Sequence, residues 1–171
     1  KSVTKDSLYG AYLPKALDIS SVMPQDFLSM SISEDGMKSI KEISREVAFY
    51  SKGHMRELDR LLRVWGFARE IADGEPLSRR ERYALEVAAL THNIAYPLCR
   101  ETYGSEDPAL QAREGAALVR DFLRDADMPA EQLERIVYLV SRHHSEEPAE
   151  EPDLQILLEA VYIASVREKH I

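Results

Sequence analysis

The stretch that decides the fold is LEVAALTHNIAYP, residues 85–97. Leu85, Ala88 and His92 fall at positions i, i+3 and i+7, so they share one face of an amphipathic helix. That face is expected to turn toward the core, which places His92 on a buried stripe one turn before Pro97 ends the helix. Two interpretations of His92 stay open: a residue of a functional site, or a core histidine that bonds to a neighbouring carbonyl group.

The composition is that of one globular domain without disulfides. The chain has 171 residues, of which 44% are hydrophobic and 30% charged, and its formal net charge is −8. This charge argues against nucleic acid as a partner, although a local basic pocket is compatible with it. Cys99 is the one cysteine, no apolar run is long enough to cross a membrane and no signal peptide is visible. We therefore expect a cytoplasmic protein. Because the chain begins with Lys1 and not with methionine, a fragment of a longer protein is compatible with the sequence.

Apolar residues recur at helical spacing from residue 37 onward. The stretches with this spacing cover about residues 37–50, 54–72, 79–92, 108–124, 130–144 and 153–169. Residues 97–104 are expected to form a loop. The sequence thus predicts an all-α fold, a single helical bundle of about six to seven helices. Residues 1–36 lack a sustained period, so we expect an irregular segment that packs on the core or extends from it to a partner chain.

Capping residues mark several of these boundaries. Ser78 and Glu81 fit a capping box, and Asp107 fits an N-cap before a proline at the first helical position. Asp153 is expected to cap the last helix. Residues expected to face the core include Leu62, Trp65, Ala117, Val161 and Ile163.

Two of the expected helices end in histidine. His92, followed by Asn93, ends one helix, and the pair His143 and His144 ends another. In an all-α domain, histidine and carboxylate side chains from separate helices commonly build a metal site. His54 begins a helix, so we interpret it as a surface or capping residue.

Five segments together resemble the HD superfamily of metal-dependent phosphohydrolases. The resemblance covers about residues 45–165 and is strongest to small bacterial HD proteins. The matching segments are RVWGFA (63–68), LTHNIAYP (90–97), QAREGA (111–116), RHH (142–144) and QILLEAVY (155–162). It implies an HD-type helical domain, here residues 37–171. It also implies a divalent metal, which active members hold with a histidine on the first core helix, a His-Asp pair and an aspartate on the last helix.

The chain departs from the family pattern at most of the metal ligands. The four ligand positions carried over by the resemblance are Arg60, His92, Asn93 and Val161. The four side chains together carry about three more positive charge units than the four ligands of the family pattern, and valine offers no ligand atom. His54 lies six residues too early to replace the missing histidine. We therefore expect a degenerate metal site, with no cofactor and no catalysis. The alternative is an active phosphohydrolase that binds Mn, Fe, Zn or Mg through substitute ligands.

The remaining polar residues suggest an anion pocket. The residues that would converge in an HD fold are Arg60, His92, Asn93, Arg142, His143 and His144. Such donors suit a phosphate group, so we expect a regulatory or binding module for a phosphorylated small molecule. The structural alternative is that Arg60 pairs with Glu114 or another carboxylate and only replaces the charge of the metal. A homo-oligomer is compatible with either interpretation.

Overall fold

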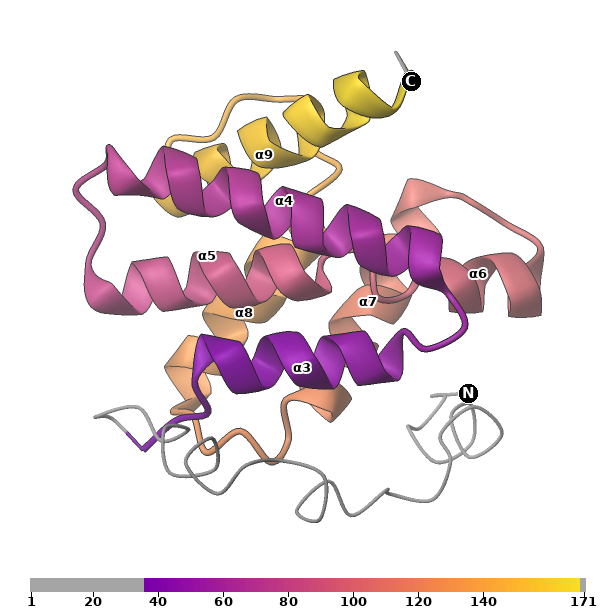
Figure 1. The fold of residues 1–171 in the computed structure, drawn as a ribbon, viewed down its shortest axis with the longest axis horizontal. Helices are drawn as coiled ribbons and strands as arrows, with labels where there is room; N and C mark the ends of the chain where they lie inside the picture. The colour runs from indigo at the N-terminus through magenta and orange to yellow at the C-terminus, as the bar shows by residue number, and fades with distance from the viewer. Residues whose placement is uncertain (1–35, 170–171) are drawn as a thin grey trace.

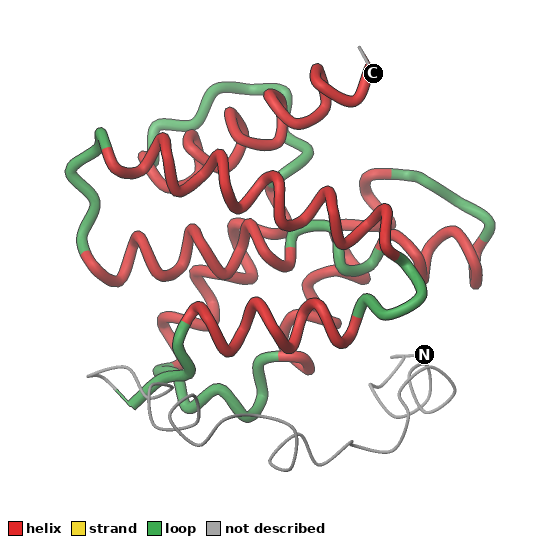
Figure 2. Tube along the Cα trace, viewed as in Figure 1, coloured by secondary structure: helices red, strands yellow, loops and turns green. Residues whose placement is uncertain are grey.

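Seven helices make up the part of the chain that the structure, a computed structural model, describes: residues 36–169 (Figure 1). They are α3 (Ile40–Tyr50), α4 (Met55–Asp73), α5 (Arg79–Thr91), α6 (Tyr96–Tyr103), α7 (Pro108–Phe122), α8 (Ala130–Arg142) and α9 (Pro152–Lys169). Figure 2 shows helices and loops, and no strand, in this part of the chain. The predicted all-α bundle is therefore confirmed. The N-terminal segment predicted at residues 1–36 lies, but for Gly36, outside the described residues.

Helix α5 runs through the middle of the bundle. It packs against α3, α4, α8 and α9, while α7 packs on α8 and α6 on α7 (Figure 1). Every residue from 84 to 91 is buried, which is typical of a helix that is covered on all sides. The helix delivers His92 into the interior, as the sequence predicts. Within residues 36–169, no helix is both long and apolar enough to span a bilayer.

Side-chain caps determine where three helices begin. Ser78 accepts a hydrogen bond from the backbone N–H of Glu81, whose carboxylate bonds back to the Ser78 N–H. The predicted N-cap at Asp107 is also present. A second capping box, between Ser39 and Glu42, starts α3 slightly later than expected. Caps of this kind each stabilise a helix by about 1 kcal/mol.

The loop predicted over residues 97–104 is wrong, because most of this segment forms α6. Pro97 lies in the first turn of α6, where the missing N–H of proline costs no intrahelical hydrogen bond. Gly104 ends the helix with a φ of 59°, the left-handed conformation that glycine adopts without strain. Pro97 therefore starts a helix instead of ending α5, which stops at Thr91.

The predicted cap at Asp153 is also wrong. Helix α9 begins one residue earlier, at Pro152. The Asp153 side chain, 1% exposed, accepts a hydrogen bond from the N–H of Leu154 within the first turn and pairs with Arg135 on α8. The guanidinium donates two hydrogen bonds to the carboxylate, at 2.8 and 2.5 Å. This bidentate pair connects α8 to α9. The sequence around Asp153 cannot reveal a partner that lies on another helix.

Three residues predicted to face the core are exposed instead: Leu62, Ala117 and Ile163. Ile163 is 40% exposed. Helix α9 carries apolar residues around most of its circumference, so the spacing alone does not identify its core side. Trp65, by contrast, packs against the core with part of its ring exposed.

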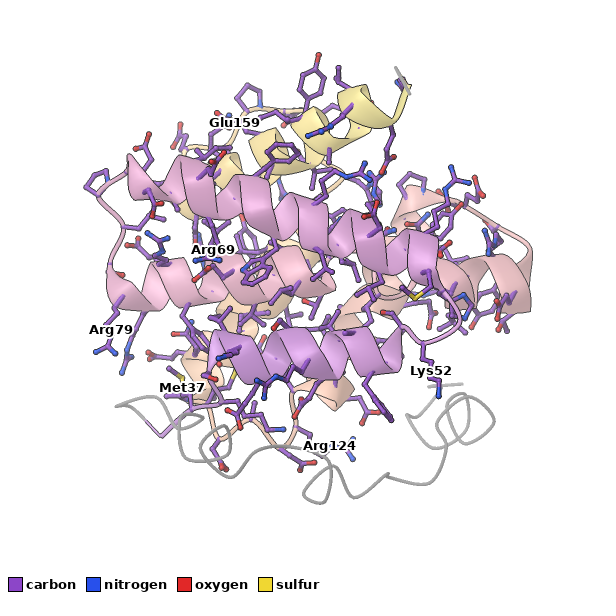
Figure 3. All side chains as sticks on the ribbon, in the orientation of Figure 1. Met37, Lys52, Arg69, Arg79, Arg124 and Glu159 are labelled. Carbon is purple, nitrogen blue, oxygen red and sulfur yellow. The ribbon has the colours of Figure 1, made fainter. Side chains whose placement is uncertain are left out.

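A polar contact joins α4 to α5 beside Trp65. The indole N–H of Trp65 donates to Glu86 Oε1 at 3.2 Å, and Arg69 Nε lies 3.1 Å from the same oxygen. The Arg69 guanidinium, labelled in Figure 3, also lies 5.0 Å from the centre of the Trp65 ring. Burial raises the pKa of the Glu86 carboxyl, while the indole hydrogen bond and the Arg69 charge act in the opposite direction.

Candidate functional site

Three histidine rings meet where α5 and α8 end. His92 follows the last residue of α5 and is 2% exposed, and His143 follows the last residue of α8 and is 3% exposed. Their ring centres lie 5.1 Å apart in an edge-to-face arrangement. The ring of His144 lies 3.8 Å from that of His143, and its Nε2 lies 3.4 Å from Gln111 Oε1 on α7. The structure thus brings together the three histidines that the sequence singles out.

Backbone carbonyl groups determine the tautomers of the two buried rings. His92 Nδ1 lies 2.7 Å from the Ala89 carbonyl oxygen, and His143 Nδ1 lies 2.6 Å from that of Val140. Since a carbonyl oxygen only accepts, each Nδ1 carries the proton and each Nε2 has a bare lone pair. Both Nε2 atoms are buried, and neither has a hydrogen-bond partner among residues 36–169. Each ring is therefore satisfied at one nitrogen and unsatisfied at the other.

Burial keeps the histidines neutral. Desolvation, with a smaller contribution from the Arg60 guanidinium, lowers the pKa of His92 to about 3, although the Ala89 carbonyl opposes this. The pKa of His143 lies well below its ordinary value, because of burial first and of His92 and His144 next. Partial burial and Arg60 lower the pKa of His144. At neutral pH the buried rings therefore present acceptor atoms and no charge.

Arg60, on α4, forms an ion pair with α9. Its Nη1 donates a hydrogen bond to Glu168 Oε2 at 2.5 Å, and Arg63 Nη1 lies 3.6 Å from the other carboxylate oxygen. The Arg60 side chain is 26% exposed. The specific pairing with Glu114 predicted as one alternative does not form, because Glu114 accepts hydrogen bonds from its neighbour Arg113. The other form of that alternative, a pair with a different carboxylate, is what the structure contains.

Arg142 and Asn93 each line a hollow whose lining does not include the three clustered histidines. Arg142 is exposed, lies 5.9 Å from the ring centre of Tyr138 on the same helix, and lines a hollow beside the α8–α9 loop. Val161 packs its side chain against the core from α9. Asn93 lies in the turn after α5, 9% exposed, and lines a separate cleft.

That cleft has a volume of about 200 Å³. Its walls are the end of α3, the start of α4, the turn that carries Asn93, and α6. His54 lies at the position before α4 without capping it, and its Nε2 is 3.8 Å from Glu101 in the same cleft. The cleft could not be predicted from the sequence, because one of its walls is α6, where the sequence predicts a loop. A signal did exist: Glu57 falls four residues before Leu61, on the apolar stripe of α4.

Comparison with protein families identifies the fold. A family model described as HD domain matches residues 58–165. The chain belongs to the HD domain family. No curated protein and no solved structure matches the chain. The HD match includes Arg60, the three clustered histidines and Val161, whereas Glu168 lies just beyond it. The family resemblance predicted from the sequence is therefore confirmed.

The described side chains of this HD domain do not assemble a set of metal ligands. Within residues 36–169, no three histidine, cysteine or carboxylate side chains lie in a group that could hold a metal ion. At two of the four positions that the sequence resemblance assigns to the ligands, the guanidinium of Arg60 and the isopropyl group of Val161 offer no ligand atom for a metal. The metal that the family implies therefore does not fit the four positions that the resemblance assigns to its ligands.

Proposed function

We propose that this HD domain is a non-catalytic binding module in which the Arg60–Glu168 ion pair replaces the metal of the family. The supporting observation is the 2.5 Å hydrogen bond that joins α4 to α9. These are the helices on which the family pattern has its first histidine and its last aspartate. The guanidinium supplies a permanent positive charge at a position from which the family ligates a cation.

The charges and donor atoms at this position support the same proposal. Asn93 offers only a neutral amide oxygen, a weak ligand for a transition metal. A divalent ion beside Arg60 would be repelled by several kcal/mol in a partly buried site, at an effective dielectric constant of about 20. Without a metal there is no metal-activated water, on which hydrolysis of this kind depends.

A phosphorylated ligand at this position receives less support. The Nε2 lone pairs of His92 and His143 would repel a phosphate oxygen rather than bond to it. Arg60 already donates to Glu168, so a phosphate would have to compete with a carboxylate. The neighbouring cleft is the better candidate for the binding site.

One observation favours a second candidate function, an active metal-dependent phosphohydrolase. The Nε2 atoms of His92 and His143 are deprotonated and unpartnered among the described residues, and each Nδ1 is held by a carbonyl group. This is the state in which imidazole coordinates Mn, Fe or Zn. The candidate requires Arg60 to move away from the rings and His144 to turn toward the same ion.

Metal content separates the two candidates. For protein purified without chelator, elemental analysis is expected to find far less than one transition metal per chain, and added manganese or iron to produce no phosphatase activity. The variant Arg60→His/Asn93→Asp/Val161→Asp restores the family pattern and is expected to gain about one metal per chain. Arg60→Gln is the matched control, since it removes the charge without adding a ligand, and it is expected to remain metal-free.

Two results would contradict the proposal. The first is stoichiometric metal in the wild-type protein, with an activity that is lost in His92→Ala. The second is a triple variant Arg60→His/Asn93→Asp/Val161→Asp that stays metal-free, which would show that the replaced ligands are not what keeps the metal out.

A further inference from the structure

Two nearly buried polar side chains line the cleft beside Asn93 without hydrogen bonds of their own. Glu57, in the first turn of α4, has a side chain that is 11% exposed, and Asn93 is 9% exposed. Both line the cleft of about 200 Å³. Neither side chain forms a hydrogen bond with any residue from 36 to 169. Their unbonded polar atoms keep some exposure to solvent at the cleft, so they are available to a molecule that enters it.

The cation closest to Glu57 satisfies it only in part. Arg100 Nη1, on α6, lies 3.7 Å from Glu57 Oε1, which is beyond hydrogen-bond distance. The Arg100 side chain is 47% exposed, and its guanidinium lies 5.5 Å from the centre of the Tyr96 ring. The carboxylate therefore keeps its capacity to accept hydrogen bonds from a molecule in the cleft.

The remaining charges make the cleft favourable for a cation. Glu101, on α6, adds a second carboxylate to the lining, and its Oε1 lies 3.8 Å from His54 Nε2. Lys52 also belongs to the lining, but it is exposed and extends from the turn after α3, away from the bundle (Figure 3). Among the polar groups that line the cleft, the Glu57 carboxylate and the Asn93 amide are the ones that a cationic ligand would meet as acceptors.

The apolar part of the lining sets the size of the ligand. Leu61, Ile94 and Leu98 line the cleft and are almost completely buried. A cavity of 150 Å³ holds a benzene molecule, so about 200 Å³ accepts a ligand of about six to ten non-hydrogen atoms. A flat ring or a short alkyl chain would cover these three side chains.

We propose that this cleft binds a small organic cation, an amine or guanidine on an apolar body. The cationic N–H groups donate to the Glu57 carboxylate and to the amide oxygen of Asn93, and the apolar body packs on Leu61, Ile94 and Leu98. The inference rests on the proposed function, since it assigns a ligand class to a domain that binds rather than hydrolyses. The ligand has the opposite charge to the phosphate expected from the sequence.

Benzylamine is a suitable probe, because its ammonium group and ring match the two halves of the cleft. In an NMR titration of the full chain at neutral pH, it is expected to bind with a dissociation constant of about 1 mM or below. Benzyl alcohol, of the same shape but neutral, is expected to bind at least about tenfold more weakly. Benzoate, which is an anion, is expected not to bind.

Variants of opposite sign test which groups recognise the amine. Glu57→Gln is expected to weaken benzylamine binding at least about tenfold, because the charge is lost while the shape is kept. Arg100→Gln is expected to strengthen binding, because it removes the cation that competes for Glu57. Glu75→Gln is the matched control, because it changes the net charge by the same amount as Glu57→Gln. Glu75 lies at an exposed position between α4 and α5, so this variant is expected to leave benzylamine binding unchanged.

Three results would overturn the inference: no benzylamine binding, equal or stronger binding of benzyl alcohol or benzoate, or an affinity that Glu57→Gln leaves unchanged. Metal content measured on the same sample keeps the two proposals apart. A metal-free, inactive protein that ignores benzylamine overturns the amine site and leaves the proposed function standing. A metal-loaded, active protein overturns the proposed function whatever benzylamine does.

Discussion

Arg60 on α4 donates a hydrogen bond to Glu168 on α9 across 108 positions of sequence, at 2.5 Å. The two side chains are 26% and 33% exposed, so solvent screens the pair only in part. A double-mutant cycle with Arg60→Gln and Glu168→Gln is expected to give a coupling energy of about 0.5–1 kcal/mol, measured by urea unfolding. Arg63 contacts the same carboxylate and can replace part of the interaction in Arg60→Gln, so the measured coupling energy is expected not to exceed this range.

The control for this cycle is the pair Arg120–Glu134, which also joins two helices but is 46% and 60% exposed. Its coupling is expected to be the smaller of the two and to vanish sooner as salt is added. A coupling at Arg60–Glu168 no larger than that of the exposed pair would mean that the guanidinium contributes nothing to holding α4 against α9.

The buried histidines are expected to destabilise the protein in mild acid. Burial lowers the pKa of His92 from 6.5 to about 3 in the folded chain, and that of His143 falls in the same direction. Below pH 6.5 the unfolded chain therefore binds protons that the folded chain does not. The stability contributed by the neutral rings is complete above pH 6.5 and is lost as the pH falls toward 3. The slope approaches about 1.4 kcal/mol per pH unit for each ring.

Urea unfolding between pH 5 and pH 8 measures this slope. His92→Gln is expected to flatten it, because glutamine does not titrate, and the packing cost of the substitution can be read separately at pH 8. If the free energy of unfolding of His92→Gln falls with pH as steeply as that of the wild-type protein, titration of His92 is not the cause of the acid destabilisation.

Two glycines are expected to respond to alanine in opposite directions. A Cβ added to Gly66, inside α4, would meet no atom within 4 Å, so Gly66→Ala is expected to stabilise the protein by about 0.5–1 kcal/mol. Gly104 ends α6 with a φ of 59°, where a Cβ is strained, so Gly104→Ala is expected to cost about 1 kcal/mol. Thermal unfolding checks both, and shifts of the same sign would contradict the prediction.

The order of the helices could be predicted from the sequence because its signals are local. The capping box at Ser78 and the N-cap at Asp107 each lie within a few residues of the groups that they bond. The signal at Pro97 is equally local but has two meanings, since a proline both ends a helix and starts one. Which meaning applies depends on where α5 has already ended, and that is decided by packing.

The candidate site could be predicted only in outline. The histidine cluster follows from two helix ends that meet, which the family resemblance implies. Three other features depend on contacts between helices far apart in the sequence. They are the partner of Arg60, the Nε2 atoms of His92 and His143, and the Glu57 carboxylate; the last two lack a hydrogen bond among residues 36–169. Such contacts leave no trace in the spacing of a single chain.

Trp65 gives these experiments an optical reporter. It is the chain's one tryptophan, and its indole N–H donates to Glu86 at the contact between α4 and α5. Its emission therefore comes from a single known environment, on the helix that also carries Glu57 and Arg60. Unfolding of every variant above can be followed by intrinsic fluorescence without a label. Because the indole lies against a carboxylate, the same signal will respond when Glu86 takes up a proton.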